Sequence, residues 1–191
     1  MKKRTRIGFL NILSTCLLYG ISIITAPLFS RLLGTGGYGN VSNYNVWVSI
    51  LSIAATLQTQ ATLANAMVEY PESLQDKYQS SVLSLSFLAF AVVSALILLF
   101  LNPISHALNL SKFFILLVLF QSIGTYGLNF MNRKLTYEMK AGRNMLLSLG
   151  TTLATLGLSL LFVLMLPQEL RYYGRIVAIA AVYGLLGLGL C

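Results

Sequence analysis

Charged side chains are scarce in this chain. Asp, Glu, Lys and Arg make up 9% of its 191 residues, whereas hydrophobic residues make up 57%. Because a soluble domain carries about 25% charged residues, the composition excludes an ordinary soluble domain and indicates that a lipid bilayer surrounds most of the surface. The 13 Lys and Arg outnumber the 5 Asp and Glu, but they lie at the ends of apolar runs. That distribution argues against nucleic acid as a partner.

Residues that commonly carry catalysis or bind metals are also few. The chain has one histidine, His106, and its five acids lie outside the apolar runs. Cys16 and Cys191 form neither a disulfide framework nor a metal-binding motif. We therefore expect no metal and no cofactor, and we regard a membrane-embedded transferase as a weak alternative. The lack of an intramembrane carboxylate also argues against a proton-coupled multidrug exporter.

Long apolar runs fill the rest of the sequence. Six of them cover residues 7–29, 41–64, 81–101, 113–130, 145–166 and 176–191. In lipid, runs of this length are helices, because a helix satisfies its own backbone hydrogen bonds. We therefore predict an all-α polytopic membrane protein, a single six-helix bundle over residues 1–191. The last run, at about 16 residues, is shorter than the roughly 20 needed to span, which suggests a truncated protein.

The basic residues are divided unequally between the two sides of the predicted bundle. Nine lie before the first run or in the loops after the second and fourth runs, namely Lys2, Lys3, Arg4, Arg6, Lys77, Arg133, Lys134, Lys140 and Arg143. The other side has four, namely Arg31, Lys112, Arg171 and Arg175. An excess of Lys and Arg is typical of the cytoplasmic side. We therefore predict a cytoplasmic N-terminus, with residues 31–40, 102–112 and 167–175 outside.

Polar residues recur at helical spacing within the apolar runs. The amides that we consider as candidates for a substrate pathway are Asn11, Gln58, Asn65, Gln121 and Asn129. Together with the Ser and Thr residues of the same run, these amides recur at a spacing that places the polar residues of each run on one helix face. That face should turn inward, away from lipid. Two interpretations remain open. In the first, the Ser, Thr and Asn residues are structural: they hold helices together, or a Ser or Thr bonds a carbonyl of its own helix. In the second, the amides line a hydrophilic cavity for a polar substrate.

Three short segments carry a resemblance to a known family. The first is Arg-Leu-Leu-Gly at 31–34 followed by Tyr-Gly at 38–39, and the others are the basic segment 132–144 and Tyr-Gly-Arg-Ile at 173–176. This pattern resembles the polysaccharide transporter family, the O-antigen (Wzx-type) flippase branch of the MATE-like exporter superfamily. The resemblance implies two lobes, of which this chain is the N-terminal one and a C-terminal lobe is missing. It also implies an undecaprenyl-diphosphate-linked oligosaccharide as substrate and the bacterial inner membrane as location.

Two arginines are candidates for binding the diphosphate of such a substrate. Arg31 follows the first run, where related flippases carry an arginine, and a guanidinium can pair two phosphate oxygens. It could equally extend to the outer interface as a membrane anchor. Arg133 has the same ambiguity on the inner side. Besides the flippase, we keep open an inactive relic or a non-transporting membrane protein.

Overall fold

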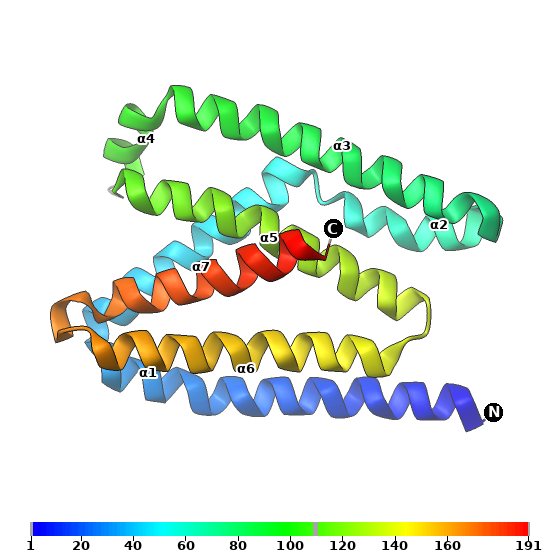
Figure 1. Cartoon of the computed structure of the whole chain (residues 1–191), viewed down its shortest axis with the longest axis horizontal. Coiled ribbons are helices and arrows are strands. Elements are labelled where there is room, and N and C mark those ends of the chain that lie inside the picture. The colour runs from blue at the N-terminus through cyan, green and yellow to red at the C-terminus, as the bar shows by residue number, and fades with distance from the viewer. Residues whose placement is uncertain (1, 109–110, 191) are drawn as a thin grey trace.

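The computed structural model describes residues 2–108 and 111–190, with the backbone alone for residues 2–6, 66–68, 72 and 108. Every regular element in these ranges is a helix. The long helices run roughly along the longest axis of the molecule (Figure 1). Among the described helices, five are long and apolar enough to cross a membrane. The predicted helical membrane bundle is confirmed, and its six runs become five helices because the first two runs share one helix.

Helix α1 (Lys2–Thr56) contains these two runs as two legs. Its 55 residues would measure about 80 Å as a straight helix, far more than the ~30 Å of a bilayer core. The backbone folds at Gly34, whose φ of 71° and ψ of 170° favour glycine. The first leg, residues 2–33, follows the bundle axis, and the second leg, residues 35–56, returns obliquely (Figure 1). The rest of the predicted outer loop 31–40 is helical.

The second leg ends at Thr56, earlier than the predicted end of that run at residue 64. Leu57 and Gln58 follow in the left-handed conformation, with φ of 53° and 46°. The chain then forms the 3-10 helix η1 (Thr59–Thr62) and the short helix α2 (Leu63–Glu69). The prediction of one continuous helix over 41–64 was therefore wrong. The Thr59 hydroxyl at this point bonds to Ser86 and Tyr126 of neighbouring helices instead of continuing the apolar pattern.

The remaining long helices are α3 (Glu72–Leu99), α5 (Lys112–Tyr137), α6 (Ala141–Met165) and α7 (Arg171–Gly189). Each begins before its predicted run, because polar residues form its first turns. Only α5 also continues past the predicted end, whereas α3, α6 and α7 end before it. The predicted outer loop 102–112 mostly forms the short helix α4 (Leu101–Leu108), where Pro103 lies in the first turn and needs no amide hydrogen. The 3-10 helix η2 (Gln168–Leu170) follows Pro167. The predicted last residue of the sixth run, Cys191, lies outside the described residues.

Helix α5 lies at the centre of the bundle and packs closely against α7. A Cβ atom at Gly187 would overlap the backbone of Gly124, and one at Gly124 would overlap the carbonyl of Tyr183. A Cβ atom at Gly184 would likewise overlap the ring of Phe120. Gly150 of α6, by contrast, faces open space. Glycine thus sets the distance between α5 and α7.

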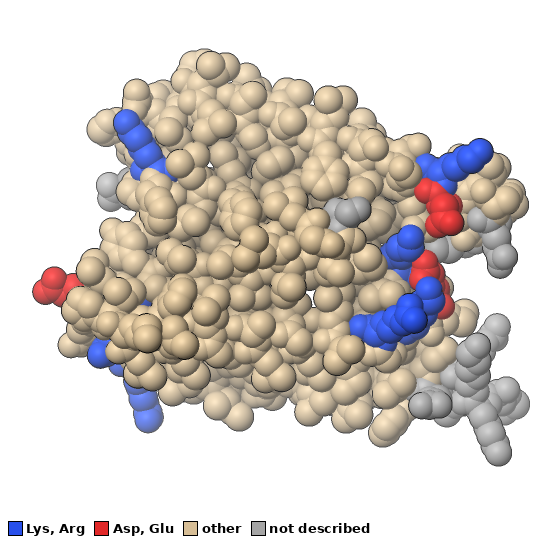
Figure 2. Space-filling model, viewed as in Figure 1, with Lys and Arg blue, Asp and Glu red and all other residues tan. Residues whose placement is uncertain are grey.

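The charged residues gather at the two ends of the bundle. Figure 2 shows Lys, Arg, Asp and Glu side chains at both ends of the visible face, with an uncharged band between them. The basic residues that precede the first run are among those whose side chains are not described. An uncharged band between two charged ends is the surface that a bilayer requires.

Candidate functional site

A cavity of about 350 Å³ lies between the first leg of α1, α6 and α7. It is close to the end of the bundle where α1 folds at Gly34, because Tyr38 and Arg175 contribute to its wall. Its polar lining consists of Ser22, Thr25, Tyr38, Thr152, Thr155, Arg175 and Tyr183. A volume of this order is within the range of small-ligand pockets. The cavity therefore combines room for a ligand with polar groups to orient it.

Four hydroxyl groups of the lining bond to their own helices. Ser22 Oγ donates to the carbonyl of Leu18 at 3.0 Å, and Thr25 Oγ1 donates to Ile21 at 2.6 Å. On α6, Thr152 and Thr155 make the same bond to the residue four positions earlier, at 2.8 and 2.7 Å. The hydroxyl hydrogens are thus occupied, whereas the oxygen lone pairs remain available as acceptors. These oxygens suit a ligand that brings its own donors, such as sugar hydroxyls.

Arg175 is the charged residue of the cavity wall. Its guanidinium carbon lies 3.4 Å from the ring centroid of Phe29, which is a cation–π contact. Its Nε and Nη1 atoms are buried, and neither has a hydrogen-bond partner among the described residues. A buried donor without a partner is costly. These donors indicate a site for an anionic group that would accept both hydrogen bonds.

Arg171, one turn before Arg175, fixes the start of α7. Its Nη1 donates to the carbonyl of Leu32 at 3.2 Å, and its Nε donates to the carbonyl of Leu166 at 3.5 Å. The carbonyls in the last turn of a helix have no partner within it. Arg171 thus caps the first leg of α1 just before Gly34 and holds Arg175 beside that leg.

The structure separates the residues that the sequence suggested as a substrate pathway. Arg31, Gln58, Asn65, Asn129 and Arg133 are exposed on the surface of the described bundle, and Asn11 is half-buried. Gln121 is buried in α5, and its Oε1 has no hydrogen-bond partner among the described residues. None of these seven lines the cavity of Arg175.

Arg175 is the candidate site residue that sequence reasoning missed. From the sequence, Arg175 was predicted only to be one of the four basic residues on the outer side. A signal was available, since Arg175 stands at the opening of the sixth apolar run within Tyr-Gly-Arg-Ile. The preference of Ser and Thr for their own helix carbonyls, by contrast, is confirmed at Thr15, Ser22, Thr25, Thr152 and Thr155.

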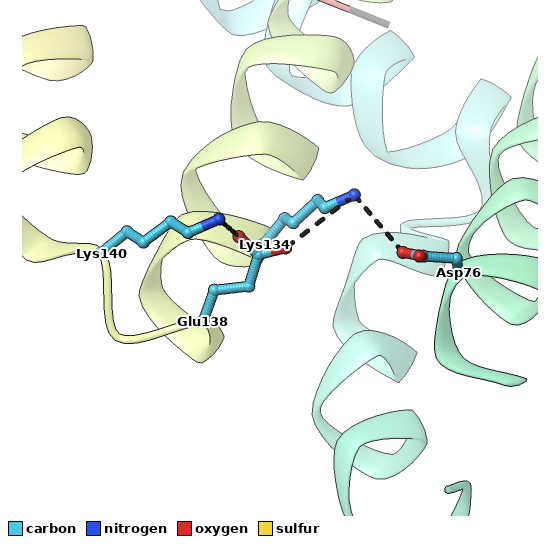
Figure 3. A network of polar contacts seen from close by, with 4 residues as sticks. All are labelled: Asp76, Lys134, Glu138 and Lys140. Carbon is cyan, nitrogen blue, oxygen red and sulfur yellow. Dashed lines mark ion pairs between the residues drawn. The ribbon is translucent and has the colours of Figure 1, made fainter. Parts of the chain in front are cut away.

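A separate ion-pair network lies at the opposite end of the bundle. Lys134 Nζ is 3.9 Å from Asp76 of α3 and 3.9 Å from Glu138, and Lys140 Nζ is 2.6 Å from Glu138. Figure 3 shows Lys134 reaching from α5 toward Asp76 on the neighbouring helix. The sequence predicts the loops after the second and fourth apolar runs on the same side of the bundle. The contact between Asp76 and Lys134 confirms that these two segments share one end. Partly exposed pairs of this kind contribute little to stability.

Comparison with known proteins identifies the family. The family model described as "Polysaccharide biosynthesis protein" matches residues 5–191. The chain belongs to this family. This is a family of polysaccharide transporters, so the resemblance drawn from the sequence is confirmed. Searches among curated proteins and among solved structures gave no match. The family and the helices together establish a multi-pass membrane protein of polysaccharide biosynthesis.

Proposed function

We propose that this chain is the N-terminal lobe of a flippase that moves an undecaprenyl-diphosphate-linked oligosaccharide across the bacterial inner membrane. In this proposal the N-terminus is cytoplasmic, and a second lobe completes the central pathway. Rocking of one lobe against the other would expose the bound head group to each side in turn. Membership of a family of polysaccharide transporters supports the proposal.

The observation that carries the proposal is Arg175 beside a hydroxyl-lined cavity. A diphosphate is a multiple acceptor, and its charge would occupy the unpartnered Nε and Nη1 donors of Arg175. The sugar hydroxyls would donate to Ser22, Thr25, Thr152 and Thr155, whose lone pairs are available. The polyprenyl tail needs no site of its own, because it can remain in the bilayer. We propose Arg175 rather than Arg31 as the principal phosphate ligand, because Arg31 is exposed and does not line this cavity.

Binding of undecaprenyl diphosphate to the purified chain in detergent tests this assignment. We expect the wild type to bind the diphosphate more tightly than undecaprenol. Arg175→Ala should lose roughly 10- to 100-fold of that affinity, as expected for charge-assisted hydrogen bonds. Arg175→Lys should be intermediate, since an ammonium keeps the charge but not the bidentate geometry.

Lys112→Ala is the matched control, because Lys112 is an exposed cation at the same end of the bundle. It should bind like the wild type. Equal affinities of the wild type and Arg175→Ala would remove Arg175 from the proposal. A loss with Arg31→Ala and not with Arg175→Ala would return the role to Arg31.

A further inference from the structure

The break between α1 and η1 lies near the middle of the bundle. Thr59 Oγ1 is hydrogen-bonded to Ser86 and lies 3.0 Å from the hydroxyl of Tyr126. Ser86 is near the middle of the 28-residue α3, and Tyr126 is near the middle of the 26-residue α5. Because both helices run along the long axis of the bundle (Figure 1), the break lies at mid-depth in the uncharged band.

The hydroxyl cluster has more acceptors than donors. Tyr126 Oη donates to Ser86 Oγ at 2.6 Å, and Ser86 Oγ donates to the carbonyl of Val82 at 2.9 Å. Thr59 has one hydrogen to give to either neighbour. All three hydroxyl hydrogens are thus used, and lone pairs are left over. Gln60, in the same turn, is 6% exposed, and its Oε1 has no partner among the described residues.

The backbone adds further oxygen atoms at this point. The last four carbonyls of a helix lack partners within the helix, and the second leg ends at Thr56. The C-terminal end of a helix also carries a partial negative charge. Non-helical backbone at membrane depth is tolerated only where protein buries it or where it lines a cavity. In many transporters such helix ends and unwound carbonyls coordinate a cation.

We propose that the break at Leu57–Gln58 is a binding site for one alkali cation. Its ligands are the hydroxyl oxygens of Thr59, Ser86 and Tyr126 together with carbonyls at the end of the second leg. Every ligand is an uncharged oxygen. Such a set replaces the hydration of a single positive charge, whereas a divalent ion in this low-dielectric setting needs carboxylates.

A bound cation would join three separate parts of the bundle. Thr59 belongs to the segment that follows the second leg of α1, Ser86 to α3 and Tyr126 to α5. The ion would therefore hold the broken second span against the third and fourth. If the proposed flippase function is correct, this site is where an ion gradient acts on the lobe. Cation binding itself does not depend on that function.

Thermal unfolding of the purified chain in detergent tests the site. We compare the melting temperature in sodium chloride, potassium chloride and N-methylglucamine chloride at equal ionic strength. A ligand that binds only the folded state raises the melting temperature, so we expect sodium or potassium to raise it by several degrees. Thr59→Val and Tyr126→Phe remove a hydroxyl with little change of shape, and each should abolish the difference between salts.

Thr15→Val is the matched control, because the exposed Thr15 hydroxyl donates to its own helix carbonyl at Asn11. It should keep the full difference between salts. A merely structural hydroxyl cluster would lower the melting temperature of the variants equally in all three salts. Saturable binding of radioactive sodium to the wild type, displaced by potassium but not by N-methylglucamine, is the second measurement and needs no variant. Equal melting temperatures of the wild type in all salts, or no saturable binding, would overturn the proposal.

Discussion

Two glycines on facing helices decide how closely α5 and α7 approach. A Cβ at Gly187 would meet the backbone of Gly124, which cannot move aside as a flexible side chain would. We expect Gly187→Ala to lower the free energy of unfolding by about 1–3 kcal/mol through overpacking, measured by thermal or denaturant unfolding in detergent. Gly157→Ala is the control, because that helical glycine has open space around it. It should be neutral or stabilising, since Ala favours a helix over Gly. Equal behaviour of the two variants would contradict the close contact.

Single residues were also where the sequence was least informative about the site. Arg31 and Arg175 both stand near the predicted outer ends of spans, and hydropathy treats them alike. The two arginines differ in the helix face that each occupies and in the residues that lie opposite that face. Arg175 is turned toward Phe29 and the cavity, whereas Arg31 is exposed. Such differences come from the packing of residues more than a hundred positions apart, which one sequence does not record.

The break in the second span is the element in which the structure departs most from the hydropathy pattern. We expect Gln58→Gly to keep or raise the melting temperature, because Gln58 has a φ of 46° that favours glycine. Gln58→Val should lower stability by about 1 kcal/mol, since a branched side chain fits the left-handed region poorly. Thermal unfolding of both variants in one salt measures the order. A continuous helix would give the reverse order, because Gly in a helix interior costs about 1 kcal/mol.

Most other elements could be predicted, because lipid forces long apolar runs into helices. Predictions from hydropathy failed at features of one or two residues, because hydropathy is averaged over a longer stretch of sequence. It could not detect Gly34 as the single fold point within α1, or the two left-handed residues after Thr56. Gln58 was interpreted, together with Thr62 and Asn65, as part of a polar stripe on a regular helix, and the adjacent Thr59 was given no role. Its hydrogen bonds to Ser86 and Tyr126 join distant segments, and only the fold brings them together.

At the scale of the whole molecule, two amide side chains face outward at the depth of the uncharged band. Gln58 adjoins the mid-depth break, and Asn129 lies one turn beyond Tyr126 in the central helix α5; both are exposed. An amide facing lipid is costly. A wet cavity or a second lobe over this surface would remove that cost. This is the physical argument, beside the family, for a partner lobe.

The two-lobe proposal predicts that these 191 residues do not transport by themselves. In a bacterial strain that lacks its glycan flippase, the chain alone should leave surface polysaccharide absent, because alternating access needs two bodies that move against each other. Coexpression with a C-terminal lobe from a complete member of the family should restore the polymer, and the same pair carrying Arg175→Ala should not. The readout is surface polysaccharide on gels, with membrane levels of each variant measured in parallel. Rescue by the chain alone would overturn the two-lobe account but leave the binding role of Arg175 intact, because purified protein tests that role separately.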